Sequence, residues 1–276
     1  MEPESKNTAP AIAFAFKYLE DQKKCSPTEC VLVTPSDHLM TPELPFLRSV
    51  LQAKPLALQG HHILFGIHPT TPDTGYGYVQ GEPLPSSDFW QVDRFVEKPD
   101  ALTAEQYLNE GGYLWNTGIF LFQIETFWQE MQCHCPSIGR FYRSSFQALH
   151  KQFSEMPSLS IDYALMEKSK KLLIAPLDIR WSDIGSWDSL YALLEKDSQG
   201  NACAGPTLSL NTSNSLILSH KRLIATLGVS DLLIVETEEA LFVGKRGESQ
   251  QIRALVEKMH PPQKAPSNTE ILAGAL

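Results

Sequence analysis

The chain has 276 residues, enough for one large domain or for a domain followed by a smaller one. Its formal net charge of −9 argues against non-specific binding to a nucleic acid backbone, although a local basic site can still hold a nucleotide. No apolar run approaches the length of a membrane-spanning helix, and the N-terminus lacks a signal-peptide pattern. Five cysteines, an odd number, fit a reducing compartment better than a disulfide framework. We therefore expect a cytoplasmic protein that binds neither nucleic acid nor membrane.

The N-terminal part alternates helical and extended patterns. Thr8 and Thr41 are predicted to be helix N-caps, each followed closely by proline. The short apolar runs between the helices are typical of buried strands. The expected elements are helices at 8–24 and 42–59 and strands at 30–34 and 62–67. This alternation predicts a mostly parallel sheet with helices on its faces.

The middle of the chain continues the pattern. Aromatic and β-branched residues lead into Glu97 and predict a strand that ends there. A second aromatic run, 113–123, is also expected to be extended, around a polar break at Asn116-Thr117-Gly118. The remaining expected elements are a helix at 102–110, helical segments within 125–149 and 160–168, and a strand at 172–177.

The character of the sequence changes near residue 200, where short strand-like runs begin at nearly regular spacing. The runs lie at 207–210, 215–218, 223–226, 232–236 and 240–243, and a helix is expected at 249–259. We predict an α/β domain over residues 1–200, a small β-rich domain over 201–260, and a disordered, proline-containing tail over 261–276.

The stretch Phe95–Pro99 places a carboxylate and an ammonium at the end of a predicted strand. Pro99 cannot continue a strand ladder and should hold Lys98 in β or polyproline geometry. Strand ends are where open α/β sheets bind ligands. There Glu97 can accept sugar hydroxyls and Lys98 can meet a phosphate as a point charge. The alternative is a solvated ion pair at a turn.

Two aspartates follow predicted strands far apart in the sequence. Asp37 comes just after the strand at 30–34, and Asp183 lies in a glycine-containing loop after the strand at 172–177. Two such carboxylates can converge on Mg²⁺, which usually takes one or two protein carboxylates together with substrate phosphates. The alternatives are local: Asp37 can cap a turn, and Asp183 can be the N-cap of a short helix at Ser186.

Two further stretches could line a ligand pocket. The glycines of Thr74-Gly75-Tyr76-Gly77-Tyr78 permit close approach of the backbone to a ligand, or simply a tight turn. Asn116 offers a side-chain amide that can both donate to and accept from a sugar hydroxyl. Gly118, two residues later, also fits a β-bulge.

The order of these stretches is more specific than any one of them. In that order the sequence closely resembles the bacterial mannose-1-phosphate guanylyltransferase family, over residues 2 to about 258. The matching motifs are Asn7-Thr8-Ala9-Pro10-Ala11, Pro35-Ser36-Asp37-His38, Thr74-Gly75-Tyr76-Gly77-Tyr78, Phe95–Pro99, Trp115-Asn116-Thr117-Gly118 and Trp181–Trp187.

The resemblance implies a Rossmann-like nucleotidyltransferase sheet, incomplete at its N-terminus, followed by a small β-helix-like domain. It implies that GTP and α-mannose 1-phosphate react to give GDP-mannose and pyrophosphate. By resemblance, Asp37 and Asp183 would hold Mg²⁺. Glu97 would bind mannose hydroxyls, and Lys98 would bind the phosphate of the sugar.

The other carried-over residues would shape the pocket. The resemblance implies that Asn116 and the backbone at Gly75 and Gly77 line the sugar site. Asn7 and Thr8 would lie in the segment near the nucleotide base.

The resemblance lacks the segment that family members carry upstream. That segment contains a first strand, a Gly-rich loop with an arginine, and a Pro-Lys-Gln stretch that together hold the triphosphate. The isomerase domain of some members is not matched either. We therefore expect a truncated or split enzyme with little turnover on its own. Its expected partner is a second copy, as a homo-dimer, or a complementing N-terminal chain. The alternative is a non-catalytic sugar-phosphate-binding or regulatory subunit.

Overall fold

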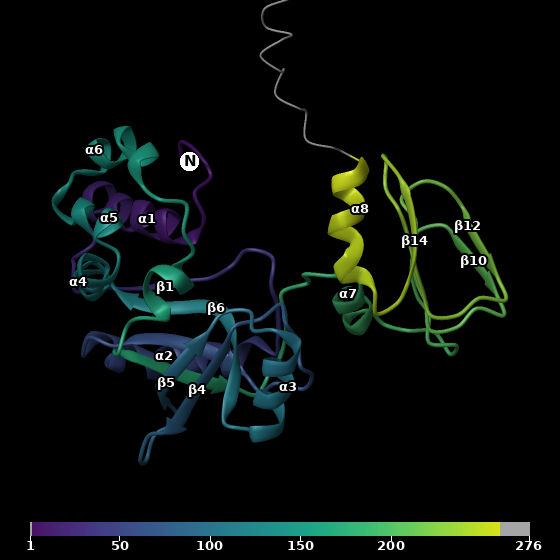
Figure 1. The fold of residues 1–276 in the computed structure, drawn as a ribbon, viewed down its shortest axis with the longest axis horizontal. Coiled ribbons are helices and arrows are strands. Elements are labelled where there is room, and N and C mark those ends of the chain that lie inside the picture. The colour runs from purple at the N-terminus through teal and green to yellow at the C-terminus, as the bar shows by residue number, and fades with distance from the viewer. Residues whose placement is uncertain (1, 260–276) are drawn as a thin grey trace, which may run out of the picture. The chain divides into compact units, whose positions relative to one another are not determined.

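The structure is a computed structural model that describes residues 2–259, apart from the side chains of Gln250, Arg253 and Glu257 (Figure 1). The chain forms two compact units, the first ending at Trp181 and the second beginning at Ser182. The tail predicted to be disordered, 261–276, lies outside the described residues.

The first unit mixes helices and strands. Its strands are β1 (Cys30–Val33), β2 (Leu39–Thr41), β3 (His62–Ile67), β4 (Tyr78–Pro83), β5 (Trp90–Val96), β6 (Tyr113–Gln123), β7 (Leu172–Leu177) and β8 (Arg180–Ser182), the last of which ends in the second unit. Its α-helices are α1 (Thr8–Lys23), α2 (Glu43–Leu58), α3 (Ala101–Glu110), α4 (Ile124–His134), α5 (Pro136–Gly139) and α6 (Phe146–Lys151). Short 3₁₀ turns, η1 (Arg140–Arg143) and η2 (Phe153–Glu155), and a π-helical turn, η3 (Asp162–Met166), complete it.

Six strands form the main sheet, in the order β1-β6-β3-β7-β5-β4, and β2 pairs separately with β8. Among the described strands of the main sheet, only β3 and β7 are parallel neighbours. β6 lies between β1 and β3 and runs antiparallel to both, and β4 and β5 also pair antiparallel. The prediction of a mostly parallel sheet is therefore wrong, because β6 separates strands that run in the same direction.

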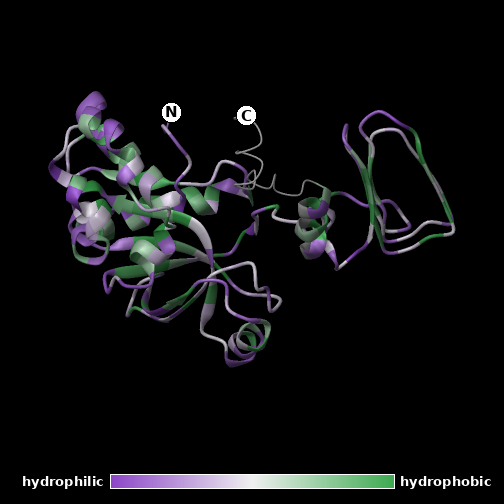
Figure 2. Cartoon of the chain, turned by 45° about the horizontal axis from the view of Figure 1, so that its top comes forward, coloured by the Kyte–Doolittle hydropathy of each residue, from purple (hydrophilic) through white to green (hydrophobic). Residues whose placement is uncertain are grey.

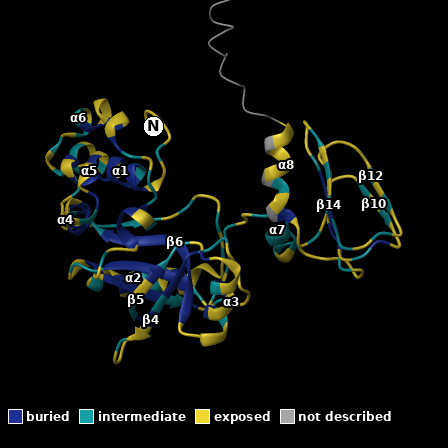
Figure 3. Cartoon of the chain, viewed as in Figure 1, coloured by how far each residue is buried: buried dark blue, intermediate teal, exposed yellow. Residues whose placement is uncertain are grey.

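The side chains of β3 alternate between the two faces of the sheet. Leu64 packs in the core formed with α1, α4, α5 and α6, whereas Ile63 and Phe65 pack in the core formed with α2. Figure 1 shows these helices on opposite sides of the sheet, and Figure 3 shows the strands between them as buried. In Figure 2 the same strands are largely hydrophobic, while the helices carry both colours. Helices therefore cover both faces, as predicted.

The first two helices begin differently from the prediction. Asn7, not Thr8, caps α1, because its Oδ1 accepts the backbone N–H of Thr8 at 2.8 Å. The Thr8 hydroxyl instead accepts the backbone N–H of Ile161 at 2.8 Å. Thr41 is not the cap of α2, which begins after Pro42 without a side-chain cap. A hydroxyl used in a contact this distant in sequence cannot be identified from its neighbours in the chain.

His62, the first residue of β3, is fully buried in the sheet. Among the described residues, neither of its ring nitrogens has a hydrogen-bond partner, and its ring packs edge-on against Phe122. Burial lowers the pKa of His62 to about 4. The folded protein therefore holds this imidazole in its neutral form.

We expect this histidine to make the protein less stable in mild acid. Because its folded pKa lies below its ordinary value, the unfolded chain binds the proton first as the pH falls below about 6.5. The free energy of unfolding should fall by about 2 kcal/mol between pH 7.5 and pH 5 from this residue. Urea unfolding of the wild type and of His62→Leu at both pH values measures the effect. An equal pH dependence in the two proteins would contradict it.

The second unit is built from short strands and two helices. Its elements are α7 (Trp187–Leu193), β9 (Ala202–Ala204), β10 (Thr207–Leu210), β11 (Leu216–Leu218), β12 (Ile224–Leu227), β13 (Leu232–Glu236), β14 (Leu241–Lys245), the 3₁₀ turn η4 (Ser249–Gln251) and α8 (Ile252–Met259). β9, β11 and β13 stack in parallel, β10 pairs in parallel with β12, and β14 closes one end in antiparallel pairing with β13. Parallel stacking of successive short strands confirms the predicted β-helix-like unit.

Helix α7 packs on the β-helix of the second unit. Trp187 and Tyr191 contact its buried apolar residues, and the Asp188 carboxylate accepts the backbone N–H of Gly247 at 2.8 Å. In the structure the second unit therefore includes α7 and begins before the predicted boundary at residue 200.

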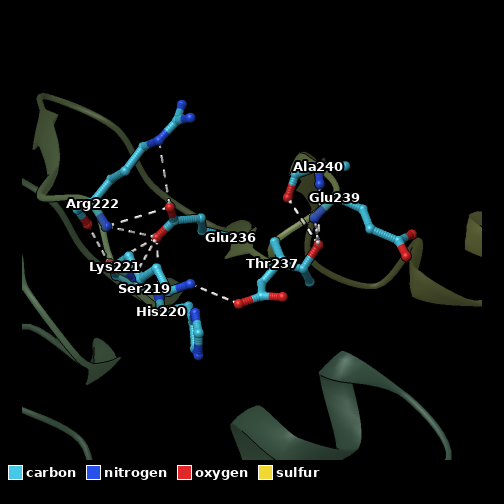
Figure 4. A network of polar contacts seen from close by, with 9 residues as sticks. Ser219, His220, Lys221, Arg222, Glu236, Thr237, Glu239 and Ala240 are labelled. Carbon is cyan, nitrogen blue, oxygen red and sulfur yellow. Dashed lines mark hydrogen bonds and ion pairs between the residues drawn. The ribbon is translucent and has the colours of Figure 1, made fainter.

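A turn of the β-helix closes around the carboxylate of Glu236 (Figure 4). The backbone N–H groups of Arg222, Lys221 and His220 donate to Oε2 at 3.1, 3.1 and 3.0 Å, and the Ser219 hydroxyl donates to it at 3.1 Å. The N–H groups of Arg222 and Lys221 are the main reason that the pKa of Glu236 falls to about 2. This carboxylate therefore stabilises a turn in its ionised form.

Candidate functional site

Glu97 and Lys98 follow the last residue of β5 and form an ion pair, with Lys98 Nζ 2.9 Å from Glu97 Oε1. The Glu97 side chain is only 10% exposed, whereas that of Lys98 is 59% exposed. The carboxylate is thus held within the protein, and the ammonium is accessible to an anion. The hydrogen bond to Glu97 raises the pKa of Lys98, which keeps the ammonium charged at neutral pH.

The backbone of Lys98 departs from the prediction. Its φ of 47° lies in the left-handed region, so the expected β or polyproline geometry before Pro99 is wrong. The chain turns here from β5 directly into α3, whose N-cap Asp100 accepts the backbone N–H of Thr103 at 2.8 Å. A non-glycine residue in this region is strained, and such strain is concentrated at functional sites.

Gly77 allows the backbone before β4 to pass against Glu97. A Cβ atom at this position would lie 2.5 Å from Glu97 Oε2 and 3.2 Å from the ring of Phe95. The Gly77 carbonyl accepts the backbone N–H of Asn116 at 2.8 Å. Gly75, by contrast, donates its N–H to Asp73 Oδ1 at 2.7 Å, so that its backbone forms a tight turn.

Asn116 places a side-chain amide near Gly77 and Glu97. It lies on β6, is 9% exposed, and accepts the backbone N–H of Gly118 on Oδ1 at 3.2 Å. Gly118 has a φ of 70°, and the pairing of β3 with β6 shifts register between Leu64 and Gly66, opposite this stretch. The irregularity that the sequence offered as the alternative reading is therefore present, and it coexists with an amide that, like Glu97, lies against Gly77.

The structure adds Asp162, which the sequence did not suggest. Its Oδ1 accepts from Asn116 Nδ2 at 3.1 Å. Burial and then the nearby charge of Glu97 raise the pKa of Asp162 to about 6. In sequence, an aspartate two residues after Ser160 looks like an ordinary acidic residue in a first helical turn. No local pattern distinguishes it from that role.

Asn7 and Thr8 lie at the start of α1, and their side chains make structural contacts. Asn7 caps the helix with a positive φ of 71°, and Thr8 holds the backbone of Ile161, the residue before Asp162. These contacts connect the start of α1 to the turn that carries Asp162. Their assignment to a nucleotide base stays a prediction.

The two aspartates predicted to bind metal lie in different units. Asp37 is exposed in the loop after β1, in the first unit. Asp183 belongs to the second unit, and its Oδ1 accepts the backbone N–H of Gly185 at 3.0 Å. Ser186, not Asp183, is the N-cap of α7. Within residues 2–259 no group of three or more His, Cys, Asp or Glu side chains is arranged for a metal. A shared Mg²⁺ site at Asp37 and Asp183 stays a prediction.

Aromatic side chains gather beside the Gly77 loop. The ring of Tyr76 lies 5.0 Å from that of Trp115 and 5.1 Å from that of Trp181. Trp181 Nε1 donates to His38 Nδ1 at 3.2 Å, which fixes the loop that carries Asp37. Each of these rings belongs to one of the motifs quoted above, and the structure brings the four separate segments together.

Gly77→Ala should destabilise the fold without removing any polar group. The added Cβ would lie 2.5 Å from Glu97 Oε2 and 3.2 Å from the ring of Phe95, so the free energy of unfolding should fall by about 1–3 kcal/mol. Urea unfolding measures this change. Gly75→Ala is the matched control, since its Cβ would meet only the end of the Asp73 side chain, at 3.0 Å. Equal stability of the two variants would show that Glu97 is not held against Gly77.

Comparison with protein families identifies the two parts of the chain. Residues 1–200 match the family model described as nucleotidyl transferase, and this range is more than half of the chain. The chain belongs to the nucleotidyl transferase family. Residues 205–259 match a model described as a MannoseP isomerase/GMP-like β-helix domain. The small β-helix of this nucleotidyl transferase thus has its own family match.

Several curated relatives of this nucleotidyl transferase are named mannose-1-phosphate guanylyltransferase. The chain is 38% identical over 273 residues to a mannose-1-phosphate guanylyltransferase of Escherichia coli, an alignment that covers 94% of this chain and 59% of that protein. It is 40% identical over 269 residues to the xanthan biosynthesis protein XanB of Xanthomonas campestris pv. campestris, with 94% of this chain and 56% of that protein covered. The predicted resemblance to the mannose-1-phosphate guanylyltransferase family is confirmed. The chain spans less than two thirds of the length of these relatives.

A solved structure agrees with the fold. A protein of Thermus thermophilus, described as a mannose-1-phosphate geranyltransferase, superposes with a TM-score of 0.84 at 26% identity, covering 94% of this chain and 77% of that one. A mannose-6-phosphate isomerase of Helicobacter pylori superposes with a TM-score of 0.57 at 30% identity, covering 66% and 72%. Within residues 2–259, no helix has both the length and the apolar character needed to cross a bilayer.

Proposed function

We propose that this nucleotidyl transferase acts on α-mannose 1-phosphate and GTP, forming GDP-mannose and pyrophosphate. The observation that carries the proposal is the group formed by Glu97, Lys98, Gly77 and Asn116. It places a covered carboxylate, an accessible ammonium and an oriented amide together, from three separate segments. This is the set of groups needed to bind a hydroxylated sugar that carries a phosphate. Since both substrates are metabolites of the cytoplasm, we place the chain there.

Each residue of the group has one task in this proposal. Glu97 accepts sugar hydroxyls, because its carboxylate is held in place against Gly77. Asn116 donates to or accepts from a neighbouring hydroxyl. Lys98 neutralises the phosphate from the accessible side, where its ammonium is already charged.

The reaction is a displacement at phosphorus. A phosphate oxygen of mannose 1-phosphate forms a bond to the α-phosphorus of GTP, and the bond from that phosphorus to the bridging oxygen of the leaving pyrophosphate breaks. Lys98 and the sugar contacts hold the attacking group in position, which is a main source of rate acceleration in such transfers. The carboxylates of Asp37 and Asp183 are the ligand type that Mg²⁺ prefers, and the ion would neutralise charge on the triphosphate.

Calorimetric titration of the chain with α-mannose 1-phosphate tests the proposal. We expect saturable binding at a 1:1 ratio, much weaker binding of glucose 1-phosphate, and none of mannose without phosphate at the same concentrations. Binding of the two sugar phosphates with equal affinity would contradict the assignment of the sugar. Absence of binding to mannose 1-phosphate would contradict the site itself.

A further inference from the structure

Asp162 occupies a central place in the sugar-phosphate group, although no motif contains it. It accepts from the carboxamide of Asn116 at 3.1 Å and also interacts electrostatically with Glu97 and Lys98. Asn116 is therefore held at both ends, by Gly118 through its oxygen and by Asp162 through its nitrogen. The orientation of the amide that would meet the sugar depends on Asp162.

Hydrogen bonds to other segments hold the turn that carries Asp162 at both of its ends. The backbone N–H before it, at Ile161, donates to the Thr8 hydroxyl at 2.8 Å. After it, the Glu167 carboxylate accepts the backbone N–H of Glu97 at 3.3 Å. The turn itself is π-helical, a geometry that is rare and frequently found at functional sites. These ties hold the Asp162 carboxyl close to the ion pair.

The charges around Asp162 are unbalanced. From the end of β5 it faces Glu97 and Lys98, and its own turn contributes Tyr163, which also interacts with Lys98, and Glu167. The carboxylates of Asp162 and Glu97 thus share one ammonium, and that of Glu167 lies on the backbone N–H of Glu97. A phosphate monoester is largely dianionic at neutral pH. Its binding at Lys98 would add two negative charges to a group that is already net negative.

We propose that Asp162 is a positioning residue that orients the Asn116 carboxamide and takes up a proton from solvent when a sugar phosphate binds beside Lys98. The inference rests on the sugar-phosphate site proposed above. It adds a linkage between binding and protonation, and it assigns that proton to one carboxyl group.

In the protein without ligand, the Asp162 carboxyl is already close to being protonated. Because burial and Glu97 raise the pKa of Asp162 to about 6, this carboxyl is poised to take up a proton near neutral pH. A bound phosphate adds negative charge and raises that pKa further. The contact with Asn116 survives protonation, since the carbonyl oxygen of a carboxylic acid still accepts a hydrogen bond. The neutral acid therefore keeps the amide in place while removing one repulsive charge.

The test compares the affinity of the wild type and of Asp162→Asn for α-mannose 1-phosphate between pH 5.5 and 7.5. Asparagine keeps the hydrogen bond to Asn116 but is neutral at every pH. The two proteins should bind nearly equally at pH 5.5. The ratio of the wild-type Kd to the variant Kd should then rise about three- to tenfold by pH 7.5, because only the wild type must acquire a proton. Ionisation of the ligand affects both proteins alike and cancels in this ratio.

Two further variants separate positioning from general structure. Asp162→Ala removes the anchor of Asn116 and should weaken binding at both pH values, whereas Asp162→Asn should not. Asp93→Asn, an exposed change on β5, the strand that leads into Glu97, should behave as the wild type. Calorimetry of the wild type at pH 7 in buffers of different ionisation enthalpy should show net uptake of roughly half a proton per bound ligand. This readout requires no variant to fold.

The outcomes are distinct. A Kd ratio that does not change with pH, or no net proton uptake by the wild type, overturns the inference while leaving the sugar-phosphate site intact. Weaker binding by Asp162→Asn at pH 7.5 also overturns it, because the carboxylate would then be a direct ligand. Absence of wild-type binding at every pH removes the proposed function, and with it the inference.

Discussion

Lys98→Met is expected to weaken binding of α-mannose 1-phosphate by about 10- to 100-fold, the loss typical of one hydrogen bond to a charged group. Two effects act in the same direction. The phosphate loses its ammonium partner, and the carboxylates of Glu97 and Asp162 lose the positive charge that offsets them. Methionine keeps much of the length of the side chain, so the turn at the end of β5 should still form. Calorimetric titration gives the change in Kd.

The dependence on salt is a second readout of the same variant. Wild-type affinity should fall as ionic strength rises, and this dependence should be smaller in Lys98→Met, because screening acts on the pair of charges that the substitution removes. Lys168→Met, at an exposed lysine in the turn after Asp162, is the matched control. If both variants bind as the wild type does, Lys98 does not hold the phosphate.

Asp183→Asn is expected to lower Mg²⁺-dependent formation of GDP-mannose by about 100-fold or more, wherever turnover of the wild type is measurable. Asparagine retains the oxygen that accepts the Gly185 N–H, so the local turn is preserved and the change is mainly one of charge. The loss should appear as a higher requirement for Mg²⁺ in a magnesium titration.

Metal binding can also be measured without turnover. Mn²⁺ replaces Mg²⁺, and electron paramagnetic resonance measures its binding to the chain in the presence of GDP-mannose. Asp183→Asn should bind Mn²⁺ at least about tenfold more weakly than the wild type, by the loss of one charged ligand. Asp178→Asn, an exposed aspartate just after β7, should match the wild type. Unchanged Mn²⁺ affinity in Asp183→Asn would remove Asp183 from the metal site.

Most elements could be predicted from the sequence because their signals are local. The apolar run at His62–Ile67 is a strand with those same limits, and α1 and α2 lie within a residue or so of their predicted ranges. The regular spacing of short runs after residue 200 corresponds to the strands of the β-helix. Periodicity of side chains is a property of neighbouring residues, so it can be read without knowing the fold.

The candidate site was only partly predictable, for a physical reason. Glu97, Lys98 and Asn116 belong to short motifs whose residue types suggest ligand binding. Asp162 has a role because it lies against Asn116 and Glu97, and these contacts join positions far apart in the chain. Its raised pKa arises from burial and from a neighbouring charge, neither of which a local pattern contains.

The sequence by itself therefore determined the elements, the order of the motifs and the family they indicate, since these depend on residue types and spacing along the chain. Tertiary structure decided the direction of neighbouring strands, the left-handed backbone of Lys98 and the grouping of Asp162 with Glu97 and Asn116. Pairing, strain and desolvation are set by which segments meet in space. In this protein the meeting of β5, β6 and the turn that carries Asp162 sets the charge balance of the proposed sugar-phosphate site.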